Sequence, residues 1–249
     1  MSRPTIRFLL LGVLAFAITL IALCPARWAS SLLPAGVQCA AWSGSIWRGQ
    51  CAGLRVSAAG PNPVADTLRW TVRPLSLLTA HLSADVQLEQ AALQAQGRVT
   101  AGSGGSLAIE ALEASGLLDK RLLAALPSGW SARFEVKAAD IDYSGSQLRK
   151  LSGTFTARDL RDQRGTVLGD YQLQFPPQAA APFTGQLRDL AGPLQLAAAV
   201  KVEANRSWQL DGTAVVRPGA PPSLARALDQ LGTADLNGQH RISIAGTMN

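Results

Sequence analysis

The chain has 249 residues, of which 47% are hydrophobic and 16% are charged, so it can bury a sizeable core and is not intrinsically disordered. Its net charge is +6, but 19 of the 23 cationic residues are arginines scattered singly along the chain, and no run is dense enough to follow a phosphate backbone. Three cysteines exclude a disulfide-dense scaffold, and two histidines leave little for histidine-based catalysis or metal binding. The composition argues against nucleic acid as a partner and against an ordinary enzyme.

The N-terminal segment carries a membrane signal. Arg3 and Arg7 precede an apolar run of 16 residues, 8–23, that only Gly12 and Thr19 interrupt. Sixteen helical residues rise about 24 Å, and a helix that continues to residue 28 reaches the roughly 30 Å of a hydrocarbon core. The positive-inside rule then predicts three segments: 1–7 in the cytoplasm, 8–28 as a transmembrane anchor, and 29–249 on the far side of the membrane, which in a bacterium is the periplasm.

A cleaved secretory signal is the alternative, because a basic start followed by an apolar run also directs export. Cleavage requires a small-x-small pattern after the apolar run. The candidate here, Cys24-Pro25-Ala26, is a poor site because its middle residue is proline. We therefore favour the uncleaved anchor, and with it a single-pass membrane protein.

Two cysteines flank a turn signal just beyond the predicted anchor. Cys39 and Cys51 lie 12 residues apart, on either side of Ser43-Gly44-Ser45, and a hairpin there would bring them near each other across two strands. An oxidising compartment would allow a disulfide between them. The alternative is a pair of buried free thiols that pack as small hydrophobic groups.

The rest of the chain alternates apolar and polar residues with period two, which is typical of strands with one solvated face. The alternating segments are 82–89, 132–138, 171–175, 194–202 paired with 208–216 across a turn at 204–206, and a last strand at Ile242 and Ile244. The fold class is therefore mainly β: one N-terminal transmembrane helix, then a large antiparallel sheet domain with one or two short helices.

Two segments beyond the anchor predict short helices. Ser223 is a suitable N-cap for a helix in which residues 224, 227, 228 and 231 form an apolar stripe that ends at Gly232. A second helix is expected over Leu117–Leu126, where Pro127 would end it.

Glycines interrupt several predicted strands. Gly153, Gly212 and Gly246 indicate bends, bulges or close approaches, and so a strongly curved sheet, although chance placement is the alternative with 23 glycines in the chain. Residues 102–105 form a flexible glycine-rich loop that lacks the lysine of a phosphate-binding loop. The β domain could therefore be subdivided near 101–106.

The sequence contains no group of residues whose types and spacing are typical of a catalytic or ligand-binding site. His81 falls on the polar face of a strand and His240 begins the last strand, each without a nearby cysteine or second histidine, so we expect both to be solvated. Asp140 and Asp142 share one strand face, where neighbouring basic residues favour an exposed polar edge over a catalytic carboxylate pair. We predict no catalytic, cofactor-binding or metal-binding residue, and no enzymatic activity.

Four of the six tryptophans fall in the first quarter of the chain: Trp28, Trp42, Trp47 and Trp70. Tryptophan combines a large apolar body with one hydrogen-bond donor, so core packing and interfacial anchoring are the favoured roles. The alternative is a cluster that faces a partner protein.

Several of these residues form a pattern that resembles a known family. Residues 44–49 read Gly-Ser-Ile-Trp-Arg-Gly, similar to the glycine-threonine-aliphatic-tryptophan-x-glycine signature of type II secretion system protein N, also called general secretion pathway protein N. Ser45 stands where threonine is commoner. Further similar segments are Leu33-Pro34, the run from Leu68 through Pro74 to Leu75, Leu77-Leu78, Leu168–Tyr171, Leu231-Gly232, Gly238 and Gly246.

The resemblance implies an accessory inner-membrane component of the machine that exports folded proteins across the outer membrane, with other secretion subunits as partners and no cofactor. It implies no catalytic residues, and it marks six fold-determining residues: Gly44, Ile46, Trp47, Gly49, Trp70 and Pro74. The cysteine pair is not transferred from the family. A tethered lipid-binding or lipid-transfer protein, with an apolar groove along its sheet, is the alternative function, because alternating strands permit both.

Overall fold

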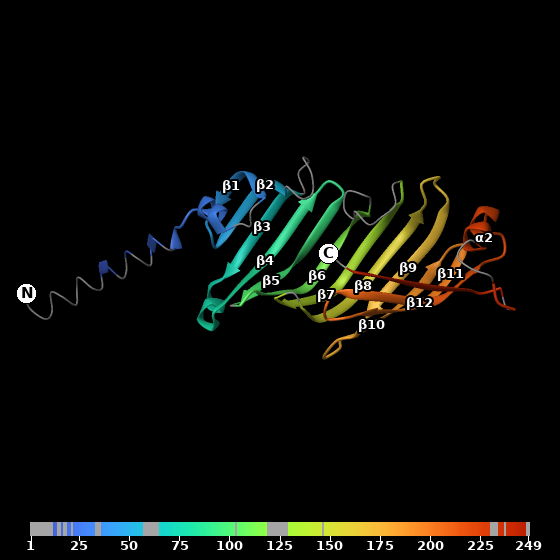
Figure 1. Cartoon of the computed structure of the whole chain (residues 1–249). Coiled ribbons are helices and arrows are strands. Elements are labelled where there is room, and N and C mark those ends of the chain that lie inside the picture. The colour runs from blue at the N-terminus through green and yellow to red at the C-terminus, as the bar shows by residue number, and fades with distance from the viewer. Residues whose placement is uncertain are drawn as a thin grey trace, which may run out of the picture. The chain divides into compact units, whose positions relative to one another are not determined.

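The computed structural model describes residues 12–13, 16, 19–20, 22–32, 36–56, 65–102, 104–118, 129–145, 147–229, 234–236 and 238–247. The chain divides into two compact units, residues 1–91 and 92–249. Near 101–106, where we considered a subdivision, β5 ends at Gly102 and β6 begins at Ser106, both within the second unit. Figure 1 shows the first unit in blue to teal and the second in green to red.

The first unit is an antiparallel meander in which each strand pairs with the next along the chain. Cys51, Leu54 and Ala65 form a buried cluster in this unit and pack against half-buried apolar side chains such as Leu68 and Trp70. Its described elements are η1 (Ala26–Leu32), β1 (Val37–Gly44), β2 (Arg48–Val56), β3 (Ala65–Arg73), η3 (Pro74–Thr79) and β4 (His81–Gln90).

The second unit is a longer meander of the same kind, and its strand order again follows the chain. Its first and last strands, β5 and β13, are not paired with each other, so this sheet is not closed. Its described elements are β5 (Leu93–Gly102), β6 (Ser106–Leu118), β7 (Ser131–Ser144), β8 (Gln147–Arg161), β9 (Val167–Phe175), β10 (Phe183–Ala191), β11 (Leu194–Val202), β12 (Ser207–Val216), α2 (Pro222–Asp229) and β13 (His240–Thr247).

The period-two pattern is realised as predicted, and it places apolar side chains on one face of the second unit. The hairpin of β11 and β12 has the expected register, with Leu194 opposite Val216 and Val202 opposite Trp208. Phe183 at the start of β10 is fully buried opposite Val202. The buried cluster on this face comprises Leu148, Leu151, Phe175, Phe183, Val200 and Val202.

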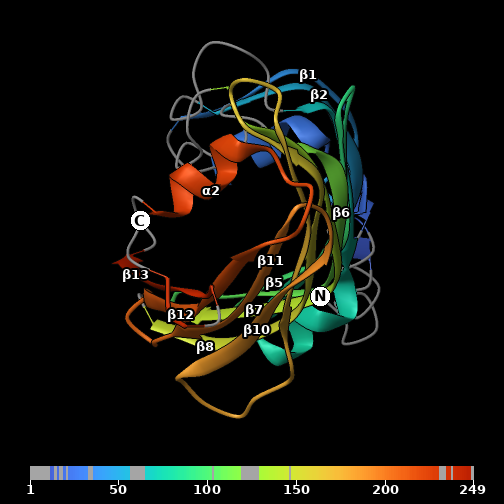
Figure 2. The ribbon, with the colours of Figure 1, turned by 90° about the vertical axis from the view of Figure 1, so that its right-hand side faces the viewer.

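Figure 2 shows that the strands of the second unit follow one another around a pronounced curve. Glycines lie where neighbouring strands leave no room for a side chain. A Cβ on Gly212 would lie 2.3 Å from the Ala197 carbonyl oxygen, and one on Gly246 would lie 2.9 Å from Cζ2 of Trp208. The prediction that strand glycines mark close approaches is therefore confirmed at these positions.

The helix predicted after Pro221 is present as α2, but it begins at Pro222, so Ser223 is not its N-cap. Proline suits the first helical position because its φ is already helical and its missing N–H would have no partner there. Leu224 and Leu228 are buried. Residues 230–233, where the predicted end of this helix falls, lie outside the described residues.

The prediction that His240 is solvated is wrong. The residue is buried, and its Nε2 lies 3.7 Å from Oδ1 of Asp229 at the end of α2. His240 pairs with the fully buried Ala214 of β12 on the apolar face of the sheet. Helix α2 therefore covers this end of the apolar face, a contact with no signal in the local sequence.

Two further predictions meet the structure only in part. The helix predicted over Leu117–Leu126 is wrong at its start, because Leu117 and Leu118 continue β6, and residues 119–128 lie outside the described residues. Of the predicted anchor, 8–28, residues 8–11, 14–15, 17–18 and 21 also lie outside them, and residues 12, 13, 16, 19, 20 and 22 are helical. The expected continuation of that helix to residue 28 is not found, because Pro25 forms a bridge to Ser45 and the 3-10 helix η1 begins at Ala26. Within the part of the chain that the structure describes, no helix is both long enough and apolar enough to cross a membrane.

A polar cluster joins three strand ends in the second unit. The Arg217 guanidinium donates to the Asp189 carboxylate and, at 2.7 Å, to the Gly192 carbonyl oxygen. Tyr171 pairs with Asp189 across β9 and β10, and its hydroxyl donates to the Leu168 carbonyl oxygen at 2.7 Å. Burial raises the pKa of Tyr171 to about 12, with a further rise from Asp189 that Arg217 opposes.

This pKa predicts a loss of stability in alkali. The unfolded chain releases the tyrosine proton near pH 10 whereas the folded chain holds it to about 12, so the contribution is intact below pH 10 and is lost as the pH rises from 10 to 12. We expect the free energy of unfolding to fall by about 2–3 kcal/mol across this window, measured by urea denaturation. Tyr171→Phe should lack this fall and Tyr143→Phe should retain it. Equal losses in wild type and Tyr171→Phe would contradict the prediction.

Candidate functional site

The β1–β2 hairpin of the first unit is bound directly to residues 24–25, near the C-terminal end of the predicted anchor. The Ile46 N–H donates to the Cys24 carbonyl oxygen at 3.0 Å. Pro25 and Ser45 form an isolated antiparallel bridge. We call this region, residues 24–25, 44–49 and Trp70, the hairpin end. It connects the N-terminal segment to the sheet through backbone contacts.

The turn of this hairpin depends on Gly44 and Ser45. Gly44 has a φ of +85°, and a Cβ there would lie 2.5 Å from the Arg48 carbonyl oxygen. The Ser45 N–H donates to that same oxygen at 2.9 Å, and the Arg48 N–H donates back to Ser45 Oγ at 3.2 Å. The turn therefore uses the side-chain hydroxyl at position 45 as a hydrogen-bond acceptor, which either serine or threonine can provide.

Trp70 on β3 covers this turn. A Cβ on Gly49 would lie 2.3 Å from Trp70 Cζ2, so the indole occupies the space that any side chain at 49 would need. Its Nε1–H donates to the Ile46 carbonyl oxygen at 3.0 Å. Trp42 packs edge-to-face on Trp70, with ring centroids 5.9 Å apart.

The structure thus brings together most of the residues marked by the family resemblance. Gly44, Ile46, Gly49 and Trp70 meet in the contacts above, and the Trp47 carbonyl oxygen accepts the Val72 N–H at 2.7 Å. Pro74 lies further along, at the start of η3. The sequence offered no local signal for the bonds between the hairpin and residues 24–25, because those partners are 20 or more residues apart.

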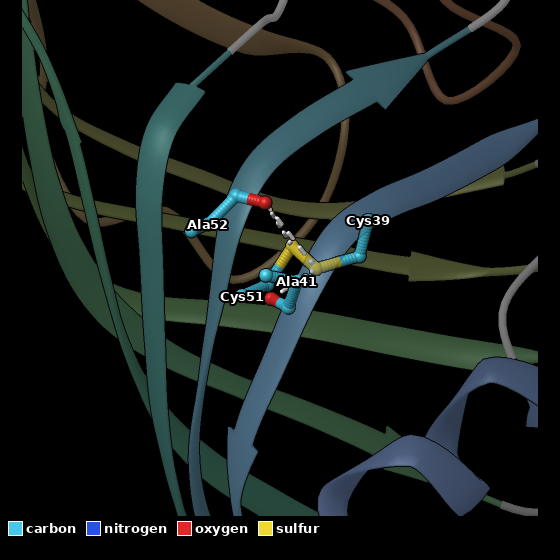
Figure 3. Close-up of a disulfide and its surroundings, with 4 residues drawn as sticks. All are labelled: Cys39, Ala41, Cys51 and Ala52. Atoms are coloured by element: carbon cyan, nitrogen blue, oxygen red, sulfur yellow. Dashed lines mark hydrogen bonds between the residues drawn. A yellow bond between two sulfur atoms is a disulfide. The ribbon is translucent and has the colours of Figure 1, made fainter.

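The predicted disulfide is present and closes the same hairpin (Figure 3). The Cα atoms of Cys39 and Cys51 are 5.8 Å apart. Cys51 is almost fully buried and lies opposite Leu68 on β3, so the bond also belongs to the core of the first unit. The Ala41 and Ala52 carbonyl oxygens lie 3.1 and 3.7 Å from Cys39 Sγ. These are oxygen–sulfur contacts, because a disulfide sulfur carries no proton to donate.

A shallow hollow of about 370 Å³ lies beside the hairpin end. Two of its lining side chains form ion pairs with residues beside it: Arg69 Nη1 lies 3.4 Å from Glu89 Oε1, and Asp85 Oδ2 lies 2.9 Å from Arg73 Nε. The hollow is lined by Ser43, Gly44, Arg48, Gly49, Gln50, Arg69, Trp70, Thr71, Asp85 and Gln87. Its arginine, carboxylate and amide groups suit recognition by hydrogen bonds.

The other candidate residues do not line this hollow. His81 is exposed, and its Nδ1 lies 2.5 Å from the Thr79 carbonyl oxygen. Asp140 Oδ1 accepts the Ala111 N–H at 2.9 Å, which holds the pKa of that carboxyl below its ordinary value, and Lys150 adds to the effect at 3.0 Å. Asp142 is opposite Lys150 on the same strand pair. Among the described residues, no group of three or more His, Cys, Asp or Glu is placed to hold a metal.

The packing of Trp70 on Gly49 predicts an energetic coupling between them. Gly49→Ala should lower the free energy of unfolding by about 1–3 kcal/mol, because the new methyl group overpacks against the indole. In a Trp70→Phe background the cost should be smaller, with a coupling energy of roughly 0.5 kcal/mol or more in a double-mutant cycle by chemical denaturation. Gly212→Ala, in the second unit, is the control and should be additive with Trp70→Phe. Additivity for Gly49→Ala as well would refute the coupling.

One of three comparisons with known proteins found a match. The family model for type II secretion system (T2SS) protein N matches residues 35–243, a range that holds both the hairpin turn and Trp70. No curated protein and no solved structure matches the chain. The matched range covers most of the sequence, and the chain therefore belongs to the type II secretion system protein N family.

Proposed function

We propose that this protein is an accessory inner-membrane component of the type II secretion machinery and acts by protein–protein interaction, without enzymatic activity. The observation that carries the proposal is the family match over residues 35–243. Family membership implies contact with other components of the secretion system. The proposed topology is a short cytoplasmic N-terminus, one membrane anchor over 8–28 and a periplasmic remainder.

Three features support that topology. The basic start and apolar run favour insertion with the N-terminus inside. The Cys39–Cys51 disulfide suits an oxidising compartment such as the periplasm. The bonds from Cys24 and Pro25 to the hairpin would join the end of the anchor directly to the folded domain.

The last strand, β13, is the most suitable surface for a partner protein. It pairs with β12 on one side only, and its eight residues include neither proline nor lysine, which commonly protect exposed edges. Ile244 on this strand is 49% exposed. Such an edge can accept a strand from another chain. Trp42 and Trp70 are a less suitable surface, because they pack on each other and on the hairpin.

A strain that lacks the protein tests the proposed role. We expect secreted hydrolases to accumulate in its periplasm while the outer membrane keeps excluding a hydrophobic dye, because export fails and the permeability barrier does not. Complementation with wild type should restore secretion. Ile244→Lys should restore it poorly, whereas Val167→Lys, which alters a residue of similar exposure on the interior strand β9, should restore it fully.

Normal secretion with a leaky outer membrane would reject this role and favour lipid handling instead. One observation supports lipid handling as the second candidate function. Within the described residues, α2 covers only one end of the apolar face of the second unit, and Leu107 and Ile244 on that face are 40% and 49% exposed. An apolar face of this kind could hold acyl chains.

The proposed topology predicts the behaviour of reporter fusions. Alkaline phosphatase fused after Asn249 should be active, because it folds only where its own disulfides can form, and a cytoplasmic reporter at the same position should be inactive. The full-length protein should remain with the membrane after carbonate extraction. Activity of the cytoplasmic reporter alone would overturn the topology.

A further inference from the structure

The connection between β3 and β4 exposes an unusual number of leucines. Leu75, Leu77 and Leu78 in η3 are 78%, 47% and 84% exposed, and Leu82 at the start of β4 is 46% exposed. No residue of η3 is buried. We call these four residues the leucine loop. Leucine at such exposure is unfavourable in water, so a cluster of four on one short connection marks a surface that contacts something apolar.

The polar residues of this connection hold the leucines outward. Ser76 Oγ donates to the Arg73 carbonyl oxygen at 2.7 Å and accepts the Ser83 N–H at 3.1 Å. Thr79 Oγ1 donates to the Ser76 carbonyl oxygen at 2.8 Å. The turn closes at Ala80, whose N–H donates to the Leu77 carbonyl oxygen at 3.1 Å. Hydrogen bonds therefore fix the backbone, and the exposure of the leucines is built into the loop.

The leucine loop lies at the same end of the first unit as the hairpin end. In the register of the sheet, Arg48 at the start of β2 is opposite Thr71, two residues before β3 ends, and Arg73 is opposite Ser83. The Val72 N–H donates to the Trp47 carbonyl oxygen. Figure 1 shows η3 where β3 and β4 meet. Residues 24–25, near the C-terminal end of the predicted anchor, therefore lie at the end of the sheet that carries the exposed leucines.

The surroundings of the loop have the chemistry of a membrane interface. Leu23 and Trp28, on either side of the bridge to Ser45, are 72% and 58% exposed, and tryptophan favours the headgroup level of a bilayer. Arg27 and Arg48 are also exposed, and basic side chains beside an apolar surface are attracted to anionic lipids.

We propose that the leucine loop inserts into the interfacial layer of the inner membrane next to the anchor and gives the domain a second, non-covalent contact with the lipid. The proposal rests on the anchored topology proposed above. Two contacts with the bilayer, the anchor and the leucine loop, would restrict rotation of the first unit about the anchor and hold it in one orientation to the membrane.

Depth-dependent fluorescence quenching tests this in the full-length protein. Leu78→Cys in a Cys24→Ser background is labelled with the NBD fluorophore without reductant, so that the Cys39–Cys51 bond stays closed. The protein is reconstituted into vesicles of phosphatidylethanolamine and phosphatidylglycerol that carry a shallow nitroxide-labelled lipid. We expect the label at 78 to lose most of its fluorescence and to emit at shorter wavelength than in water. Leu75→Ser with Leu77→Ser should reverse most of this quenching.

Two control positions separate the possible outcomes. A label at Ala91→Cys, on the exposed turn after β4, should stay unquenched, and a label on the native Cys24 reports on the anchor itself. Quenching at 24 with none at 78 would show that the leucine loop does not insert into the membrane, and it would still support the proposed anchor. Quenching at neither position would reject both. If the label at 78 shifts to shorter wavelength without lipid quenching, the loop is covered by protein and the proposal is wrong.

Discussion

The first unit depends on the packing of one indole over one glycine. Trp70 fills the space above Gly49, and its only donor, Nε1–H, binds the Ile46 carbonyl oxygen. The side chain thus combines apolar contact with the satisfaction of a turn carbonyl that would otherwise need water. With that turn held, the backbone of Ile46 and Ser45 is placed to bind residues 24–25. The link between the N-terminal segment and the sheet therefore rests on a contact between adjacent strands.

The two units share the same meander topology but are stabilised by different kinds of contact. In the first, a disulfide, a tryptophan pair and a tight turn concentrate specific contacts at few positions. In the second, β8–β12 bury a continuous apolar cluster, while β13 keeps one free edge and a half-exposed isoleucine. Among the described residues, α2 alone covers part of the apolar face of this sheet, and the remainder stays accessible. That accessible surface explains why partner binding and lipid binding are both compatible with this fold.

Residues that interact locally were predictable. Alternation places side chains on opposite faces of a strand irrespective of the rest of the fold, which is why the β11–β12 hairpin had the expected register. The disulfide was predictable because a short hairpin limits the distance between its strands. The wrong predictions concerned residues whose burial or secondary structure depends on contacts with distant parts of the chain. His240 is buried because α2 packs over it, and Leu117 extends β6 because pairing with β7 outweighs its helical pattern.

From the sequence alone came the mainly β antiparallel architecture, the strand faces, the cysteine pair and the family, because these depend on residue type and spacing over short distances. Only the tertiary structure decided that Trp70 covers Gly49, that the hairpin binds residues 24–25, and that the leucines of η3 point outward at that same end of the sheet. Each of these depends on strand register and on residues distant in the chain. The alternation of side chains fixes which face a residue occupies, but not which neighbour covers it.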